Sequence, residues 1–98
     1  MKTCLHIVST SMQRSDALAR AVSLAQPADA ILLIEDGVLA LSDPDRCLAP
    51  FNGKRVYVLQ PDAEARGMTA AHQASLTAVD YDGFVSLTTQ FTKTVSWF

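Results

Sequence analysis

The chain has 98 residues, of which 49% are hydrophobic and 18% are charged. This length suits one small domain, residues 1–98, and leaves no room for a second. The net charge is -2 and the pI is near 5.5, and the Lys and Arg residues are scattered, so the chain lacks the basic footprint that direct nucleic-acid binding needs. A hydrophobic fraction of 49% implies more apolar surface than one small core can bury, so we expect an oligomer.

The apolar segments are short. Residues 3–8 precede the polar run 9–11 and do not make the apolar stretch of a signal peptide. The longest apolar run, Ala30–Ile34, is too short to span a bilayer. We therefore expect a cytoplasmic protein.

Two cysteines, Cys4 and Cys47, fit a reducing compartment without a disulfide framework. They form neither a Cys-x-x-Cys pair nor a plausible zinc set with His6 and His72. We expect no metal and no cofactor.

The first half of the chain predicts two strands separated by a helix. Residues 4–8 form a β-rich segment that ends at the polar run 9–11. Ser15 can cap a helix that Pro27 stops. The apolar positions of this helix recur at helical spacing, at Leu18, Ala21, Val22 and Ala25. The continuous apolar run 30–34 predicts a central strand buried on both faces.

Loop and turn residues dominate the middle of the chain. Residues 37–41 suit a helical turn, and the Pro- and Gly-containing stretches 43–45 and 50–53 indicate loops. Residues 55–59 predict a third buried strand.

The second half predicts two further helices, a strand and a packed tail. Pro61 fits an early helical position, and Gly67 is well placed to end that helix. Residues 76–79 predict a fourth strand, followed by Asp80 as the N-cap of a helix. The apolar face of this helix is Phe84, Leu87, Thr88 and Phe91. Residues 95–98 predict a final short strand or packed tail.

Strands that alternate with helices indicate right-handed crossovers and a mostly parallel sheet. The fold class is therefore α/β: a single-domain three-layer sandwich with four to five strands flanked by helices.

Four segments carry a resemblance to a known family. They are Leu5–Ser9, Leu32–Val38, Val56–Asp62 with Ala65–Gly67, and Val79–Val85. In their order and spacing, which extend over residues 5–97, the chain resembles the TusB/DsrH family of small, non-catalytic subunits of sulfur-relay complexes. The resemblance implies a DsrEFH-like fold.

The resemblance also implies a function. The chain would be an accessory subunit, not an enzyme, in a complex with TusC-like and TusD-like subunits, arranged as a dimer of heterotrimers. In that family the TusD-like subunit of the complex accepts persulfide sulfur from an upstream carrier. The complex passes this sulfur toward a downstream thiolase that modifies position 2 of the wobble uridine in certain tRNAs.

One position separates the branches of the family. The sulfur-oxidising DsrH branch carries a cysteine in its first helix, and ungapped alignment places Ala21 there. This favours the TusB branch. The alternatives are a DsrH-like subunit of a DsrEFH complex in intracellular sulfur oxidation, a small thiol sulfurtransferase that uses Cys47, and a free-standing homo-oligomeric binding module.

Cys47 is the weak candidate for a catalytic nucleophile. It follows Asp43-Pro44-Asp45-Arg46 in a predicted loop, where Arg46 would favour the thiolate and the two aspartates would oppose it. An incidental loop thiol is the alternative interpretation. Cys4, inside the first strand, is interpreted as a small buried hydrophobe.

The candidate interface residues are Glu35, Asp36, Gly37, Trp97 and Phe98. The Glu35-Asp36-Gly37 turn follows a strand, where open α/β sheets place ligands, or it is a tight turn in which Gly37 takes a positive φ. No phosphate-binding loop accompanies its carboxylates, so partner contact is the expected use. Trp97 and Phe98 are either interface anchors or core residues.

Two further features have structural interpretations. His6 could act as a general base, but a strand histidine with a structural hydrogen bond fits better, since no triad spacing is present. Asp62 and Arg66, four residues apart, predict an exposed helical ion pair.

Overall fold

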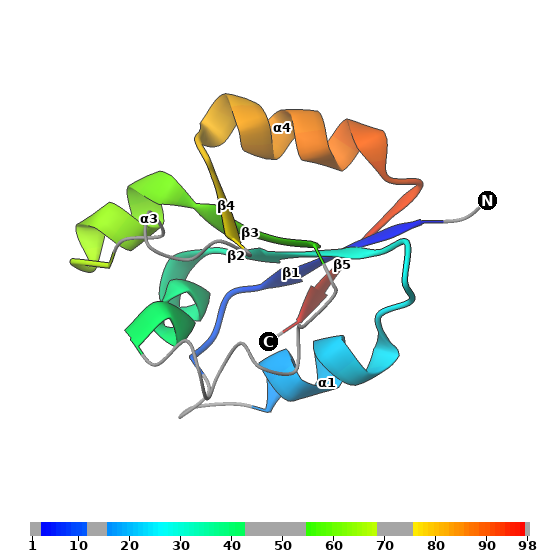
Figure 1. Cartoon of the computed structure of the whole chain (residues 1–98), viewed down its shortest axis with the longest axis horizontal. Coiled ribbons are helices and arrows are strands. Elements are labelled where there is room, and N and C mark those ends of the chain that lie inside the picture. Colours follow the sequence, from blue (N-terminus) through cyan, green and yellow to red (C-terminus); the bar gives the residue numbers. More distant parts are fainter. Residues whose placement is uncertain (1–2, 12–15, 43–54, 69–75, 98) are drawn as a thin grey trace.

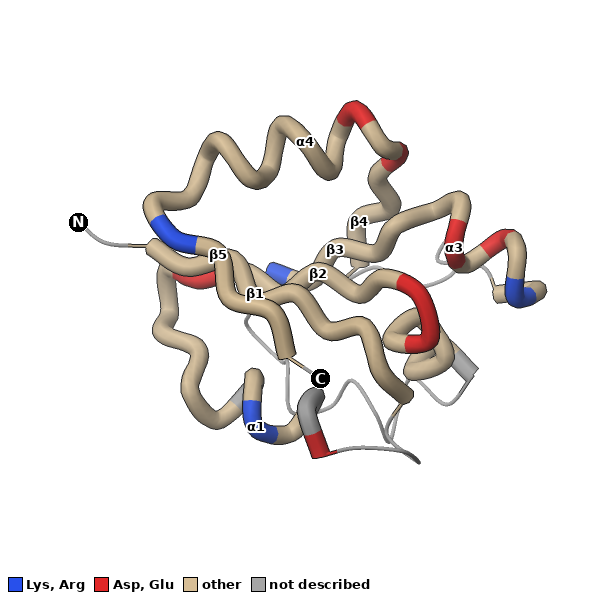
Figure 2. Tube along the Cα trace, turned by 180° about the vertical axis from the view of Figure 1, so that it is seen from behind, with Lys and Arg blue, Asp and Glu red and all other residues tan. Residues whose placement is uncertain are grey.

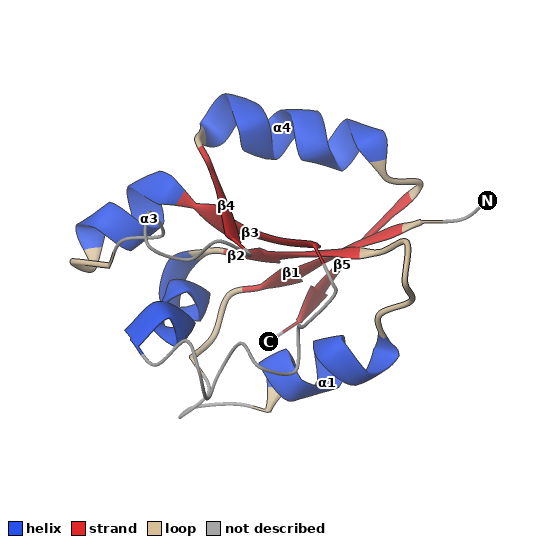
Figure 3. Ribbon diagram, viewed as in Figure 1, coloured by secondary structure: helices blue, strands red, loops and turns tan. Residues whose placement is uncertain are grey.

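The computed structural model describes residues 3–11, 16–42, 55–68 and 76–97. Strands and helices alternate along the chain (Figures 1 and 3). Their order is β1 Cys4–Val8, α1 Ala17–Leu24, β2 Ala30–Leu33, the 3-10 helix η1 Glu35–Ser42, β3 Arg55–Leu59, α3 Gln60–Ala65, β4 Leu76–Val79, α4 Tyr81–Gln90 and β5 Lys93–Trp97. Within these segments no helix combines the length and apolarity that a bilayer crossing requires.

The strands form one five-stranded sheet in the order β4-β3-β2-β1-β5, and every paired neighbour is parallel. β2 is the middle strand and its four residues are all buried, because apolar side chains on both faces of a strand need cover from both sides. The predicted α/β class and the central position of this strand are confirmed. The final strand begins at Lys93, two residues earlier than predicted.

Each face of the sheet has its own core. On one face, α1, η1 and α3 pack against strand residues that include Ile31, Leu33 and Val58. On the other face, Leu87 and Phe91 of α4 pack against Leu5, Ile7 and Leu32, among others. Figure 1 shows α4 on one side of the sheet and α1 on the opposite side. Among the described residues the three layers are therefore unequal, since α4 is the one helix that covers its face of the sheet.

The helix ends follow the local sequence. The Asp80 carboxylate accepts a hydrogen bond of 2.8 Å from the Gly83 amide and caps α4, which offsets an otherwise unpaired helix donor. Pro61 lies in the first turn of α3, and Gly67 follows the helix with φ +70°. α1 ends at Leu24, before Pro27. The predicted cap Ser15 lies outside the described residues.

Gly37 is required for space, and the prediction that it takes a positive φ is wrong. Glu35 has the positive φ, at 47°. A Cβ built on Gly37 would lie 2.2 Å from the carbonyl oxygen of Val8, at the end of β1. Only glycine lets η1 approach β1 this closely.

Gly37→Ala is therefore expected to lower the free energy of unfolding by about 3 kcal/mol, because backbone atoms must move to admit the methyl group. Gly67→Ala is the matched control: no atom lies within 4 Å of its added Cβ, and the left-handed backbone alone costs about 1 kcal/mol. Urea denaturation of both variants gives the comparison, and equal losses would contradict the close-approach explanation.

Candidate functional site

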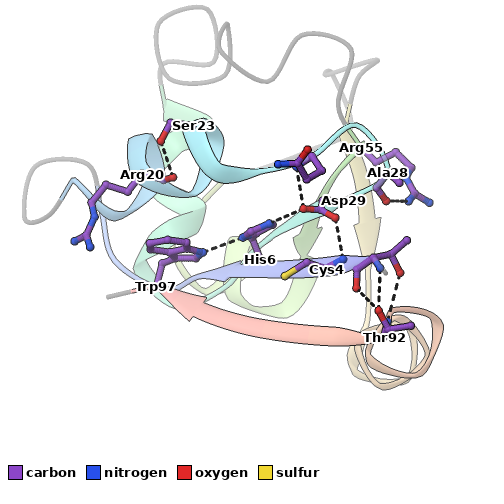
Figure 4. A network of polar contacts seen from close by, with 11 residues as sticks. Cys4, His6, Arg20, Ser23, Ala28, Asp29, Arg55, Thr92 and Trp97 are labelled. Atoms are coloured by element: carbon purple, nitrogen blue, oxygen red, sulfur yellow. Dashed lines mark hydrogen bonds and ion pairs between the residues drawn. The ribbon is translucent and has the colours of Figure 1, made fainter. Parts of the chain in front are cut away.

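A buried carboxylate lies immediately before β2. Asp29 is 4% exposed, and its two oxygens accept three hydrogen bonds (Figure 4). Oδ1 accepts from the Cys4 amide at 2.9 Å, and Oδ2 accepts from the Gln26 amide at 2.9 Å and lies 3.0 Å from His6 Nε2. One side chain thus ties the start of β1 to the turn between α1 and β2.

The contact continues from His6 to the last strand. Trp97 Nε1 donates to His6 Nδ1 at 3.0 Å. An indole nitrogen can only donate, so Nδ1 is the acceptor and the ring proton of neutral His6 is on Nε2, facing Asp29. Both ring nitrogens are occupied, which agrees with a structural histidine rather than a general base.

Trp97 also contacts α1. The Arg20 guanidinium lies 5.5 Å from the centre of the Trp97 ring, and Trp97 packs against the core on that face of the sheet. Figure 4 shows the Trp97 ring pointing toward His6 below α1. These contacts hold β5, an edge strand, to the rest of the fold. A role for Trp97 at an interface stays a prediction.

Hydrogen bonds favour the ionised form of the Asp29 carboxylate. Burial opposes ionisation, but bonds from the Gln26 amide, the His6 ring and the Cys4 amide outweigh it, so the pKa of Asp29 is lowered. A buried anion with three donors is a satisfied structural group. This charge in turn affects the neighbouring thiol.

Cys4 is a poor nucleophile. Burial raises the pKa of its thiol, and the Asp29 charge raises it further, while Lys93 and the backbone of Val95 lower it less. The thiol is therefore protonated at neutral pH, and the reactive form is the thiolate. Cys4 is partly rather than fully buried, so its interpretation as a buried hydrophobe is only approximate. Cys47 lies outside the described residues.

Cys4, His6 and Asp29 offer one sulfur, one nitrogen and one oxygen within 4.8 Å of one another. Such a set could bind zinc in principle. Here a metal would have to displace the Nε2 proton and break the His6–Asp29 hydrogen bond, which already satisfies both groups. The geometry is that of a closed hydrogen-bond network.

The Glu35-Asp36-Gly37 turn is tied to α3. The Asp62 carboxylate accepts from the Glu35 amide at 2.6 Å, and Arg66 Nε donates to Asp36 Oδ1 at 3.0 Å. The ionic partner of Arg66 is therefore Asp36, which corrects the predicted pairing with Asp62. Glu35 is exposed and Gly37 is buried. As an interface, the turn remains a prediction, and Phe98 lies outside the described residues.

Sequence reasoning missed Asp29. It directly precedes the apolar run 30–34, and nothing in the local sequence indicates its partners. Cys4 and Trp97 lie far from it along the chain. One signal was available: an acidic residue directly before a central strand, in a chain with a histidine in the neighbouring strand.

These features define a small, all-parallel α/β domain with a hydrogen-bonded rather than a reactive polar centre. The family model described as DsrH like protein matches residues 10–94. Protein TusB of Pectobacterium parmentieri is 38% identical, with 95% of this chain and 99% of the relative covered. Protein TusB of Erwinia tasmaniensis is 36% identical over the same shares. The chain belongs to the DsrH-like family, and the predicted resemblance is confirmed.

Two solved structures share the fold. The ychN protein from E. coli has a TM-score of 0.80 at 13% identity, over 98% of this chain and 99% of its own. Protein Tm0979 from Thermotoga maritima has a TM-score of 0.66 at 21% identity, over 89% and 92%. At these identities the likeness concerns the fold alone.

Asp29→Asn is expected to lower the free energy of unfolding at pH 7 by about 2 kcal/mol, because a buried charge-assisted network is lost. The folded pKa of Asp29 lies below the unfolded value. Its stabilisation is therefore fully present above about pH 4 and is lost as pH falls through the folded pKa.

Urea unfolding at pH 7 and pH 3 checks both points. Between pH 7 and pH 3, the free energy of unfolding should fall less in Asp29→Asn than in the wild type. Asp16→Asn, whose side chain is 75% exposed, is the control and should behave like the wild type. If the free energy of unfolding of Asp29→Asn fell as much as that of the wild type, the pH dependence could not be assigned to Asp29.

Nitrogen-15 NMR of the neutral His6 ring should show the tautomer that carries its proton on Nε2. Trp97→Phe removes the only donor to Nδ1 that the described residues supply, and it should lower stability by about 1–3 kcal/mol. Protonation at Nδ1 in the wild type would refute the network as drawn.

Proposed function

We propose that this chain is a TusB-like, non-catalytic subunit of a sulfur-relay complex that delivers persulfide sulfur toward 2-thiolation of the tRNA wobble uridine. The observation that carries this proposal is the near full-length match to proteins named TusB. The chain would act in the cytoplasm, as one domain over residues 1–98.

The chemistry of the described residues supports an accessory role. Sulfur transfer needs an accessible thiolate, and the Cys4 thiol has a raised pKa. Ala21, at the position of the helical cysteine of the DsrH branch, is fully buried in the core. The transferring cysteine would therefore be on a partner subunit.

The proposed partners are TusC-like and TusD-like chains, in a dimer of heterotrimers. Membership of the DsrH-like family supports a complex with other sulfur-relay subunits. The Glu35-Asp36-Gly37 turn and the Trp97–Phe98 end are the proposed contact regions. The exposed side chain of Glu35 is presented by a turn that Asp62 and Arg66 hold in place, so it would need little reorganisation on binding.

The test is co-expression with the TusC-like and TusD-like chains of the same source, using wild type and a Cys4→Ser/Cys47→Ser variant. Both should give a hexamer-sized complex by light scattering and equal rates in a persulfide-transfer assay, because no cysteine of this chain would carry sulfur.

The control is the corresponding cysteine variant of the TusD-like subunit, which should assemble but lose transfer. Loss of transfer in Cys4→Ser/Cys47→Ser, with assembly intact, would show that a cysteine of this chain carries sulfur. Failure to assemble with either wild-type partner would refute the proposed complex itself.

A further inference from the structure

The outer surface of α4 differs from that of an ordinary solvent-facing helix. Tyr81 is 61% exposed and Val85 is 63% exposed, the two largest fractions among the exposed large hydrophobic side chains of the described residues. They are four positions apart and therefore lie on the same side of the helix. Thr89 continues that line one turn later and is also exposed.

Charge is scarce on this surface. The exposed residues of the helix are Tyr81, Asp82, Val85, Ser86, Thr89 and Gln90, and we call them the α4 outer face. Asp82 is the only charged residue among them. A solvated helix face usually carries several charges, whereas the centres of protein interfaces are depleted in charge and enriched in tyrosine.

The position of α4 is a second reason to expect that a partner buries this side of the molecule. α4 is the only described helix on its face of the sheet, while α1, η1 and α3 share the other (Figure 1). A ten-residue helix is about 15 Å long and about 10 Å wide, and five strands span roughly 19 Å between the outermost strand axes. Ile34, Tyr57 and Val79 beside it are consequently only partly buried. Within the described residues, α4 and the apolar surface around it therefore have incomplete cover.

The two ends of α4 carry opposite charge. Asp80 and Asp82 are exposed at its first turn, and Lys93 begins β5, just after the helix. Figure 2 shows acidic positions at the end of α4 that follows β4 and a basic position where the chain leads into β5. Arg55 adds a second cation there, with its guanidinium 5.3 Å from the centre of the Phe91 ring. An antiparallel copy of the same helix would place acidic end against basic end twice, and would also oppose the helix dipoles.

We propose that the α4 outer face is the contact surface for a second copy of this chain, packed antiparallel about a two-fold axis that passes beside Val85. The axis lies there because Val85 and Ser86 are the middle of the helix, Tyr81–Gln90. Tyr81 of each copy then lies over the Thr89 turn of the other, as an isologous interface requires. This dimer goes beyond the proposed sulfur-relay role and does not depend on it.

The size of the face predicts a weak dimer in isolation. One short helix covers less than the about 800 Å² per partner of a stable interface. Association should therefore be concentration-dependent for the isolated chain.

Sedimentation equilibrium over a range of protein concentrations tests the proposal. Val85→Glu brings two carboxylates together at the axis and should raise the dimer dissociation constant at least tenfold. Leu24→Glu is the matched control, because Leu24 is 58% exposed on α1, and it should leave the constant within twofold of wild type. Circular dichroism checks that both variants fold.

A crosslinking experiment locates the axis. In a Cys4→Ser/Cys47→Ser background, Val85→Cys should form a disulfide-linked dimer under mild oxidation, and Leu24→Cys should not. The proposal fails if wild type stays monomeric at every concentration, if Val85→Glu dimerises as wild type does, or if Val85→Glu prevents binding of a TusC-like or TusD-like chain while self-association is unchanged. None of these outcomes alters the sulfur-transfer test, so the two proposals fail separately.

Discussion

The Asp29 carboxylate is the interaction on which the arrangement of this fold depends. It accepts hydrogen bonds from the start of β1, from the turn that ends the α1 crossover, and from a histidine whose other nitrogen holds the last strand. A buried carboxylate is costly unless such donors satisfy it. The same network gives the register of the edge strand β5 a specific side-chain contact, in addition to its backbone pairing with β1.

This network also explains why Cys4, His6 and Asp29 are unreactive, although they lie close together and could each bind a metal. His6 uses both ring nitrogens and Asp29 uses both carboxylate oxygens. Burial, together with the charge of Asp29, raises the pKa of the neighbouring Cys4 thiol and keeps it protonated. A polar cluster that fixes strands is therefore a poor cluster for transferring sulfur. In the proposed role, the subunit would contribute shape and contacts to a complex, and the sulfur chemistry would belong to another chain.

Much of the fold could be predicted from the sequence, because most of the strands are short, predominantly apolar runs; β5, Lys-Thr-Val-Ser-Trp, is the exception. β1, β3 and β4 begin and end at the predicted residues, and Asp80 and Gly67 mark helix ends through local backbone chemistry. The site could not be predicted in the same way. Trp97 and His6 are 91 positions apart, so their contact depends on which strands become neighbours. The constraint on Gly37 comes from the end of β1 and not from the local turn conformation that the sequence indicates. Arg66 binds Asp36, 30 positions away, in preference to the local pairing that helical spacing indicated.

The most direct test of the non-catalytic role is to trap the sulfur in transit. The assembled complex would be loaded from its upstream carrier, alkylated, and digested, and the persulfide would be assigned to individual cysteines by mass spectrometry. This account predicts persulfide on the TusD-like subunit and none on Cys4 or Cys47. A persulfide on either of these residues that forms and disappears at the rate of transfer would contradict it.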